Sequence, residues 1–324
     1  MPDIAIYPAT PGARDRFVLE RRGPRPAHDP WRHQGLIVED ERSAEGGRAR
    51  IATVLLTGRE CPWRCAMCDL WTFTTEADTP AGAIPAQVGA ARSILRQATV
   101  PVTGMKLYNA GSFFDPRAVP DTDYDAVAHE LAGLSRVIVE SHPALVGPRV
   151  DRFLQALDRH REPGSSSAQL EVAMGMETAH PDALDRLNKR FTLEDFAKAA
   201  RALGDRGVTL RVFLLISPPF VPAHEQDAWL LRSLDAAFSC GASVVSLVPT
   251  RPGNGAIDAL AASGSFRAPD LDDIERSLVL ALGHARGRGR VFVDLWDLER
   301  FANGADDTAA RRVRLESMNL GQCA

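Results

Sequence analysis

The sequence predicts an α/β protein: a partial or full (β/α) barrel with parallel strands, an irregular N-terminal arm and a short C-terminal extension. From about residue 48, apolar strand-like runs alternate with amphipathic helical stretches, in six or seven successive units. The chain has 324 residues, of which 45% are hydrophobic and 25% charged, so it can bury the core that such a barrel needs. We therefore expect an arm at 1–48, a barrel core at 49–250 and an extension packed on the barrel at 251–324.

The arm is rich in Pro, Arg and Gly, as in RRGPRPAHDPWRHQG, and shows little helical or strand periodicity. Its arginines are interpreted as a solvated face or, alternatively, as an RNA-binding site. The formal net charge of −4 and the pI of about 6.1 do not indicate a nucleic-acid-binding protein.

Seven strands are predicted, because these segments are apolar and β-branched and most of them end near Gly, Pro or Ser. They are 49–58, 102–112, 135–143, 168–177, 208–219, 242–250 and 289–298. Six helices are predicted at 84–97, 121–134, 149–161, 180–204, 224–239 and 269–286. The fourth of them has Pro181 and Asp182 in its first turn, where both residues favour a helix start.

The cellular compartment follows from what the sequence lacks. No run of 18 apolar residues occurs, so we expect no membrane span, and the N-terminus does not have the layout of a signal peptide. Five cysteines do not make a disulfide framework in a chain of this size. We therefore expect a cytoplasmic protein.

Polar or conformationally special residues follow the predicted strands, where a (β/α) barrel carries its chemistry. NAGS ends the second strand, ESHP the third, GMET the fourth and SPP the fifth. Directly after the first strand come Cys61, Cys65 and Cys68, spaced C-x3-C-x2-C. Three thiolates from a single loop can converge on one soft metal centre.

The number of cysteine ligands distinguishes a structural zinc site from an iron–sulfur cluster with an open iron. Structural zinc sites and most iron–sulfur clusters take four protein ligands, and Cys240 and Cys323 lie far along the chain. A [4Fe–4S] cube held by three cysteines keeps one iron open for a substrate or cofactor, and this interpretation is favoured. A structural zinc loop completed by His33 or His142, and a non-enzymatic electron-transfer protein, remain as alternatives.

With this spacing after the first strand, the chain resembles the radical S-adenosylmethionine superfamily. The resemblance implies an oxidoreductase or lyase-type enzyme with a [4Fe–4S] cluster and S-adenosylmethionine as cofactors. In that family the reduced cluster cleaves the sulfonium C–S bond, and the 5′-deoxyadenosyl radical abstracts hydrogen from the substrate. It also implies a one-electron reductant, such as a flavodoxin or ferredoxin, as partner.

The resemblance further implies which residues contact the cofactor. They are Met67, Ala110, Gly111, Ser112, Glu140, Glu177 and Lys189. Met67 stands where the family often has an aromatic residue against the adenine, and 110–112 stand for its glycine-rich motif. Glu140 resembles the carboxylate that meets the ribose or ammonium group. Glu177 and the cation twelve residues later match a signature in which the cation faces the cofactor carboxylate.

A narrower resemblance covers most of residues 48–322. NAGSFFDPR, VESHP, GMET…LNKRFTLEDF, LLISPPF, DLWDLE and ESMNLGQ are together similar to the branch that contains the archaeosine-biosynthesis radical enzyme and is related to the elongator catalytic subunit. The substrate expected from it is a modified nucleobase, in tRNA or free, or another small molecule. No acetyltransferase domain is expected after Ala324, so we do not expect the activity of the elongator subunit. His142 is read as a proton carrier or as a hydrogen-bonded strand-end histidine, and Asp294, Trp296 and Asp297 as a lining of the barrel mouth or as structural residues.

Overall fold

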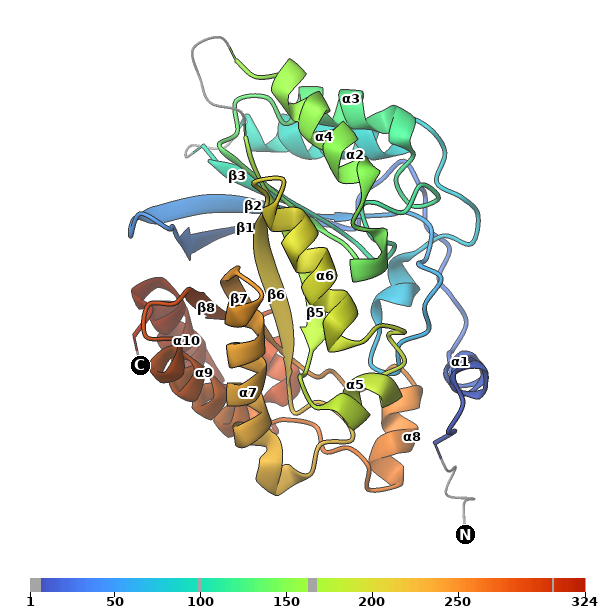
Figure 1. Ribbon diagram of the computed structural model, residues 1–324, viewed down its shortest axis with the longest axis vertical. Coiled ribbons are helices and arrows are strands. Elements are labelled where there is room, and N and C mark those ends of the chain that lie inside the picture. Colours follow the sequence, from blue (N-terminus) through green and yellow to red (C-terminus); the bar gives the residue numbers. More distant parts are fainter. Residues whose placement is uncertain (1–6, 98–100, 163–167, 305, 324) are drawn as a thin grey trace.

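A computed structural model describes residues 7–97, 101–162, 168–304 and 306–323, and it confirms the predicted fold class. One sheet of eight strands runs in the order of the sequence, β1 to β8, with helices on its outer side (Figure 1). The strands are β1 (Gly35–Arg42), β2 (Arg48–Leu56), β3 (Gly104–Asn109), β4 (Arg136–Glu140), β5 (Gln169–Glu177), β6 (Thr209–Ile216), β7 (Ala242–Pro249) and β8 (Arg290–Val293). β1 is antiparallel to β2, and every later pair is parallel.

The α-helices of the described residues connect successive strands or flank the sheet. They are α1 (Pro11–Glu20), α2 (Ala83–Leu95), α3 (Tyr124–Glu130), α4 (Pro148–Arg159), α5 (Pro181–Arg186), α6 (Leu193–Gly204), α7 (Gln226–Ser239), α8 (Ala256–Ala262), α9 (Leu271–Ala285) and α10 (Thr308–Gly321). Capping boxes start α6, at Thr192, and α9, at Asp270. Among the described helices none combines the length and the apolar character of a membrane span.

The arm and the C-terminal segment contain more regular secondary structure than the sequence predicts, and one predicted helix is interrupted. The arm at 1–48 contains α1 and β1, and the segment 251–324 supplies β8 to the sheet and α8 to α10 around it. The single helix predicted at 180–204 is instead two helices, α5 and α6. Asn188 and Arg190 between them both have φ of 64°, which an α-helix does not tolerate. The domain division itself stays a prediction.

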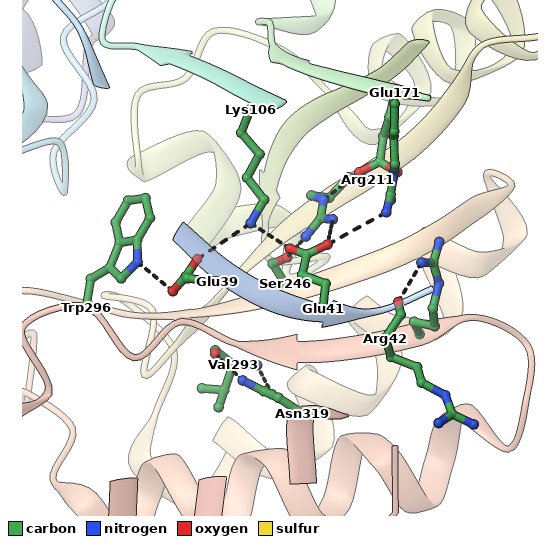
Figure 2. A network of polar contacts seen from close by, with 12 residues as sticks. Glu39, Glu41, Arg42, Lys106, Glu171, Arg211, Ser246, Val293, Trp296 and Asn319 are labelled. Carbon is green, nitrogen blue, oxygen red and sulfur yellow. Dashed lines mark hydrogen bonds and ion pairs between the residues drawn. The ribbon is translucent and has the colours of Figure 1, made fainter. Parts of the chain in front are cut away.

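The two faces of the sheet carry different side chains: apolar ones toward the helices and charged ones toward the interior of the barrel. Between sheet and helices lies a continuous apolar core, to which Val54, Leu107 and Val172 contribute outward-facing side chains. Inside the sheet, charged side chains from β1 and β3 to β6 meet each other and a hydroxyl of β7 (Figure 2). We call this the lumen network; it comprises Glu39, Glu41, Lys106, Arg136, Glu171, Arg211 and Ser246.

Arg211 is the centre of the lumen network, with 2% of its side chain exposed. Its guanidinium donates to Glu41 at 2.9 Å, to Glu171 at 2.6 Å and to the Ser246 hydroxyl at 3.0 Å. Burial alone would lower the pKa of Arg211, but the Glu41 and Glu171 carboxylates raise it well above its ordinary value. Because Glu41 belongs to β1 and Arg211 to β6, the contact spans the lumen and draws the sheet into a nearly closed barrel (Figure 2).

The edge of β8 is covered by one side chain of α10 and one of the residue that follows this helix. The amide of Asn319 donates to the carbonyl of Val293 and accepts from its N–H, both at 2.9 Å (Figure 2). Gln322 does the same for Val291, at 2.7 Å in both directions. Two side-chain amides thus take the place of a neighbouring strand, which leaves this part of the edge without open hydrogen-bonding groups. The ESMNLGQ stretch of the sequence has this structural role.

Candidate active site

The cysteine loop follows β2 and is fixed to three other loops by hydrogen bonds. The N–H of Cys61 donates to the carbonyl of Ala110 after β3 (3.4 Å), and the N–H of Ala66 donates to the carbonyl of Leu187 after α5 (3.0 Å). Asn254, which precedes α8, donates its amide N–H groups to the carbonyls of Ala66 (2.7 Å) and Cys68 (3.3 Å). The loop therefore lies at the carboxyl ends of the strands, as the barrel predicts.

The three thiols of this loop are free, and Cys65 is buried. Burial raises the pKa of Cys65 to about 12, and the positive charge of Lys189 opposes that rise. Burial likewise raises the pKa of Cys68, and the Cys61 and Cys65 sulfurs raise it further, which places the three thiols in one electrostatic environment. Within the described ranges, no three His, Cys, Asp or Glu side chains are gathered in the geometry of a metal site.

By their chemistry the thiols nevertheless fit a soft metal centre. They are three sulfur donors in one loop, and their hydrogen bonds are weak or local: the Cys61 thiol lies 3.7 Å from the carbonyl of Trp63, and Cys68 has a backbone hydrogen bond with Leu70. Of the two histidines named for the zinc alternative, His142 is not free to act as the fourth ligand, because both of its ring nitrogens have other partners. Nδ1 accepts from the N–H of Ala144 at 3.2 Å, and Nε2 donates to the carbonyl of Lys189 at 2.8 Å.

These two hydrogen bonds also decide the role of His142. Burial and the nearby charge of Lys189 lower the pKa of His142 to about 3, so the ring stays neutral near pH 7. Trp63 of the cysteine loop stacks on this ring, with 3.5 Å between the ring centroids. His142 is therefore a structural link between the cysteine loop and the Lys189 loop, which agrees with the strand-end reading and not with a proton carrier.

Glu177 and Lys189, predicted twelve residues apart in the sequence, are in contact. The Lys189 ammonium lies 2.5 Å from a Glu177 oxygen and 2.7 Å from the carbonyl of Gly175, and both side chains are buried. Burial alone would lower the pKa of Lys189, but the Glu177 carboxylate raises it above its ordinary value. A Cβ at Gly175 would lie 2.2 Å from Glu177 Oε1 and 2.6 Å from Lys189 Nζ, so only glycine leaves room for this pair.

Glu140 at the end of β4 is half-buried and has no cationic partner within ion-pair distance among the described residues. Burial raises the pKa of Glu140 to about 8; a backbone hydrogen bond from Asn109 and the charge of Lys189 hold it from rising further. The carboxyl group is therefore mostly protonated at neutral pH. A half-buried carboxyl group with a raised pKa, close enough to the buried Lys189 to respond to its charge, marks a candidate functional site.

The predicted segment 110–112 joins the cysteine loop to β4. A Cβ at Gly111 would lie 2.2 Å from the carbonyl oxygen of Arg59, so glycine is required where the two loops touch. The Ser112 hydroxyl accepts from the N–H of His142 at 3.1 Å. Met67 is half-buried and packs against the apolar side chains of α8 and the segment after it, which include Ile257 and Phe266.

Several residues of this region were not predicted. Asn254 anchors the cysteine loop and caps α8, since its side-chain oxygen accepts from the N–H of Ile257 at 2.7 Å; the Gly-Asn-Gly run before an apolar stretch was the available signal. Arg251 pairs with Asp294 at 2.6 Å, and the indole N–H of Trp296 donates to Glu39 at 3.0 Å. These contacts lie beside the lumen network, so Asp294 and Trp296 have structural partners.

Comparison with known proteins supports the predicted resemblance. No family model matches the chain. Archaeosine synthase subunit beta of Methanosarcina acetivorans is 26% identical over 274 residues, which cover 79% of this chain and 74% of that protein. Among solved structures, methylornithine synthase (PylB) superposes with a TM-score of 0.52 and 14% identity, over 82% of this chain and 68% of that one. Elp3 of Methanocaldococcus infernus, with its N-terminus deleted, superposes with a TM-score of 0.51 and 13% identity, over 72% of this chain.

The similarity in sequence to archaeosine synthase subunit beta agrees with the resemblance that the motifs indicated, and Elp3 is similar in fold. The chain spans 59% of the length of the Elp3 chain. The likeness to the two solved structures, at 13% and 14% identity, concerns the fold alone.

Proposed function

We propose that this chain is a radical S-adenosylmethionine enzyme whose [4Fe–4S] cluster is held by Cys61, Cys65 and Cys68. The observation that carries the proposal is the convergence of the cysteine loop, the Lys189–Glu177 pair and the unpaired Glu140 at one end of the barrel. When bound, the cluster and S-adenosylmethionine supply a 5′-deoxyadenosyl radical that abstracts hydrogen from a substrate. An electron carrier or a zinc protein has no use for buried carboxylates and a lysine beside the thiols.

In this proposal the buried charges bind and orient the cofactor. Lys189 offers an ammonium group to a carboxylate, and Glu177 and the carbonyl of Gly175 keep that ammonium in place. Glu140 offers an acceptor to an ammonium group or a ribose hydroxyl once it loses its proton. The backbone of 110–112 borders the same space because it touches the cysteine loop at Arg59 and Cys61. Met67 contributes apolar surface at the edge of the thiols.

The substrate and the reductant follow from the relatives. The name of the Methanosarcina acetivorans protein refers to archaeosine synthesis. We therefore propose a modified nucleobase, in tRNA or free, as the first substrate class to test, with other small molecules as the alternative. The reaction needs an external electron, for which a flavodoxin or ferredoxin is the proposed partner. A cytoplasmic location, where such carriers stay reduced, is the matching expectation.

Anaerobic reconstitution tests the proposal directly. The purified chain should take up about four iron and four sulfide, as a cubane does, and should then form 5′-deoxyadenosine from S-adenosylmethionine under a strong reductant. A chain that binds one zinc tightly and assembles no cluster would support the structural zinc alternative. A chain that assembles a cluster and transfers electrons without binding S-adenosylmethionine would support the electron-transfer alternative.

A further inference from the structure

The N-terminal segment runs along the loops that make up the candidate active site. α1 lies beside α8, where Phe17 and Val18 pack on Ala256 (Figure 1). The chain approaches the start of α8 so closely that a Cβ at Gly255 would lie 2.0 Å from the carbonyl oxygen of Arg21. From there it passes the cysteine loop and continues into β1. The segment is therefore part of the barrel wall around the site.

A buried carboxylate ties this segment to the start of the cysteine loop. Glu60, which directly precedes Cys61, has 9% of its side chain exposed and accepts from Arg22 at 2.7 Å and from Arg25 at 2.5 Å. Arg64 of the loop itself lies 3.2 Å from the same carboxylate. The side chain of Arg22 is only 6% exposed and that of Arg25 is 19% exposed, so neither is a free surface cation.

The same two arginines also hold the far end of the loop. Their guanidinium groups lie 4.8 Å and 6.0 Å from the ring centroid of Trp71, three residues after Cys68. Trp71 is buried, and the next residue, Thr72, offers its carbonyl to the ring nitrogen Nε2 of His28 at 2.6 Å. The N-terminal segment thus contacts the cysteine loop both before and after its three thiols.

The same N-terminal segment also contacts the loop that carries Lys189. Asp15 of α1 accepts from the Asn188 amide at 2.8 Å and from the Arg190 guanidinium at 2.7 Å. Asn188 and Arg190 are the two residues with left-handed backbone, a conformation that costs free energy for residues other than glycine and needs support from outside the loop. Asn188 also donates to the carbonyl of Arg64 at 2.8 Å, which links the two loops to each other.

We propose that Asp15, Arg22 and Arg25 are positioning residues that hold the cysteine loop and the Lys189 loop in register. The inference rests on the proposed function, because it is the register between thiols and lysine that a cluster and its cofactor would use. Arg22 and Arg25 are engaged in ion pairs inside the protein and do not form the solvated face predicted from the sequence, whereas RNA binding by the arm stays a prediction. In contrast, Arg21 hydrogen-bonds to the Phe17 carbonyl of its own helix and makes no contact with Glu60 among the described interactions.

Cysteine labelling of the metal-free protein tests this proposal. The rates at which iodoacetamide modifies each cysteine are followed by mass spectrometry, with Cys240 and Cys323 as internal references. In the double variant Arg22→Ala/Arg25→Ala, the labelling of Cys61, Cys65 and Cys68 should rise by about tenfold or more. Losing charge-assisted hydrogen bonds shifts a local opening equilibrium by at least that factor.

Matched controls separate positioning from general loosening. Arg21→Ala removes the same charge from the same segment and should leave all five labelling rates unchanged, while Asp15→Ala should expose the thiols as the double variant does. If the double variant does not fold, Glu60→Gln replaces it with the same expectation. Equal rises at Cys240 and at the loop cysteines, or no rise at all, would overturn the proposal.

Failure of the proposed function is distinguishable, since the labelling uses the metal-free protein. A wild-type chain that assembles no cluster contradicts the proposed function without changing the labelling result. In the metal-free protein, Arg22→Lys should retain the thiol protection that the double variant loses. In reconstituted protein, Asp15→Ala should bind S-adenosylmethionine more weakly than the wild type.

Discussion

Glu140 gives the sharpest test of the site, because its protonation is fixed by burial and can be changed without changing its size. The folded protein holds the pKa of Glu140 at about 8, against an ordinary value of 4.5. Between these two values the folded chain keeps a proton that the unfolded chain releases. The free energy of unfolding must then fall as pH rises through this interval, and the stability contributed by the proton is fully present only below pH 4.5.

The size of the effect follows from that interval. At about 1.4 kcal/mol per pH unit, a difference between 4.5 and about 8 sets an upper bound of about 5 kcal/mol. Glu140→Gln replaces the neutral acid by a neutral amide of the same shape, so the two proteins should have similar stability near pH 5. At pH 8.5 the variant should be the more stable by a few kcal/mol.

Urea unfolding at a series of pH values from 5 to 9 measures this difference, and other titrating groups cancel between the two proteins. Glu39→Gln, which changes a half-exposed carboxylate of the lumen network, is a suitable control and should not reproduce the pH trend. A difference between wild type and Glu140→Gln that stays constant over the whole range would refute the reasoning, since Glu140 would then be ionised in the folded protein. Binding of the cationic cofactor to reconstituted protein at pH 7 should also release about 0.9 proton, the fraction that a pKa of about 8 leaves bound.

Three further predictions follow from the contacts. Cys65→Ala should lose most of the iron that the wild-type chain takes up on anaerobic reconstitution, whereas Cys323→Ala should keep it; iron analysis decides. Lys189→Ala should keep the cluster but bind S-adenosylmethionine about tenfold to a hundredfold more weakly, as expected for a lost charge-assisted contact, and a titration that finds unchanged affinity would contradict its role. Glu41→Ala should lower the free energy of unfolding by about 3–5 kcal/mol, because Arg211 would remain buried with one carboxylate fewer; a loss below about 1 kcal/mol in urea unfolding would show that the pairing across the lumen is dispensable.

The sequence predicts the parallel strands well because most of them carry a run of apolar residues, many of them β-branched. β1 was not predicted, since four of its eight residues are charged, and a strand of that kind reads as loop. α1 was missed for a related reason: its buried face includes Arg14, whose guanidinium is neutralised by Asp185, 171 residues away. Both elements become regular only through partners that are distant in the sequence.

The site shows the same division. The cysteine spacing and the Glu177–Lys189 interval are local patterns, and the structure brings the second pair into contact as expected. The break of the helix at Asn188 was accessible in principle, because Asn tolerates the left-handed region. The break at Arg190 was not, since its conformation depends on Asp15. The sequence could not show which distant side chains support these loops, namely Asp15 for the Lys189 loop and Arg22 for the cysteine loop.

Charge in this barrel has two roles, separated along the strands. Arg136, Glu171 and Arg211 lie four to six residues before the carboxyl ends of β4, β5 and β6, where they neutralise one another. Glu140 and Glu177, at the ends of β4 and β5, differ from them. Among the described residues Glu140 has no counter-ion within ion-pair distance, and Glu177 pairs with Lys189, which follows its strand in the sequence. Balanced charges in a lumen stabilise the barrel wherever they stand, whereas an unbalanced buried carboxyl group costs free energy unless a ligand compensates it. Glu140 places such a carboxyl group at the end of the barrel that carries the three thiols, and this coincidence is a physical reason to look for the cofactor there.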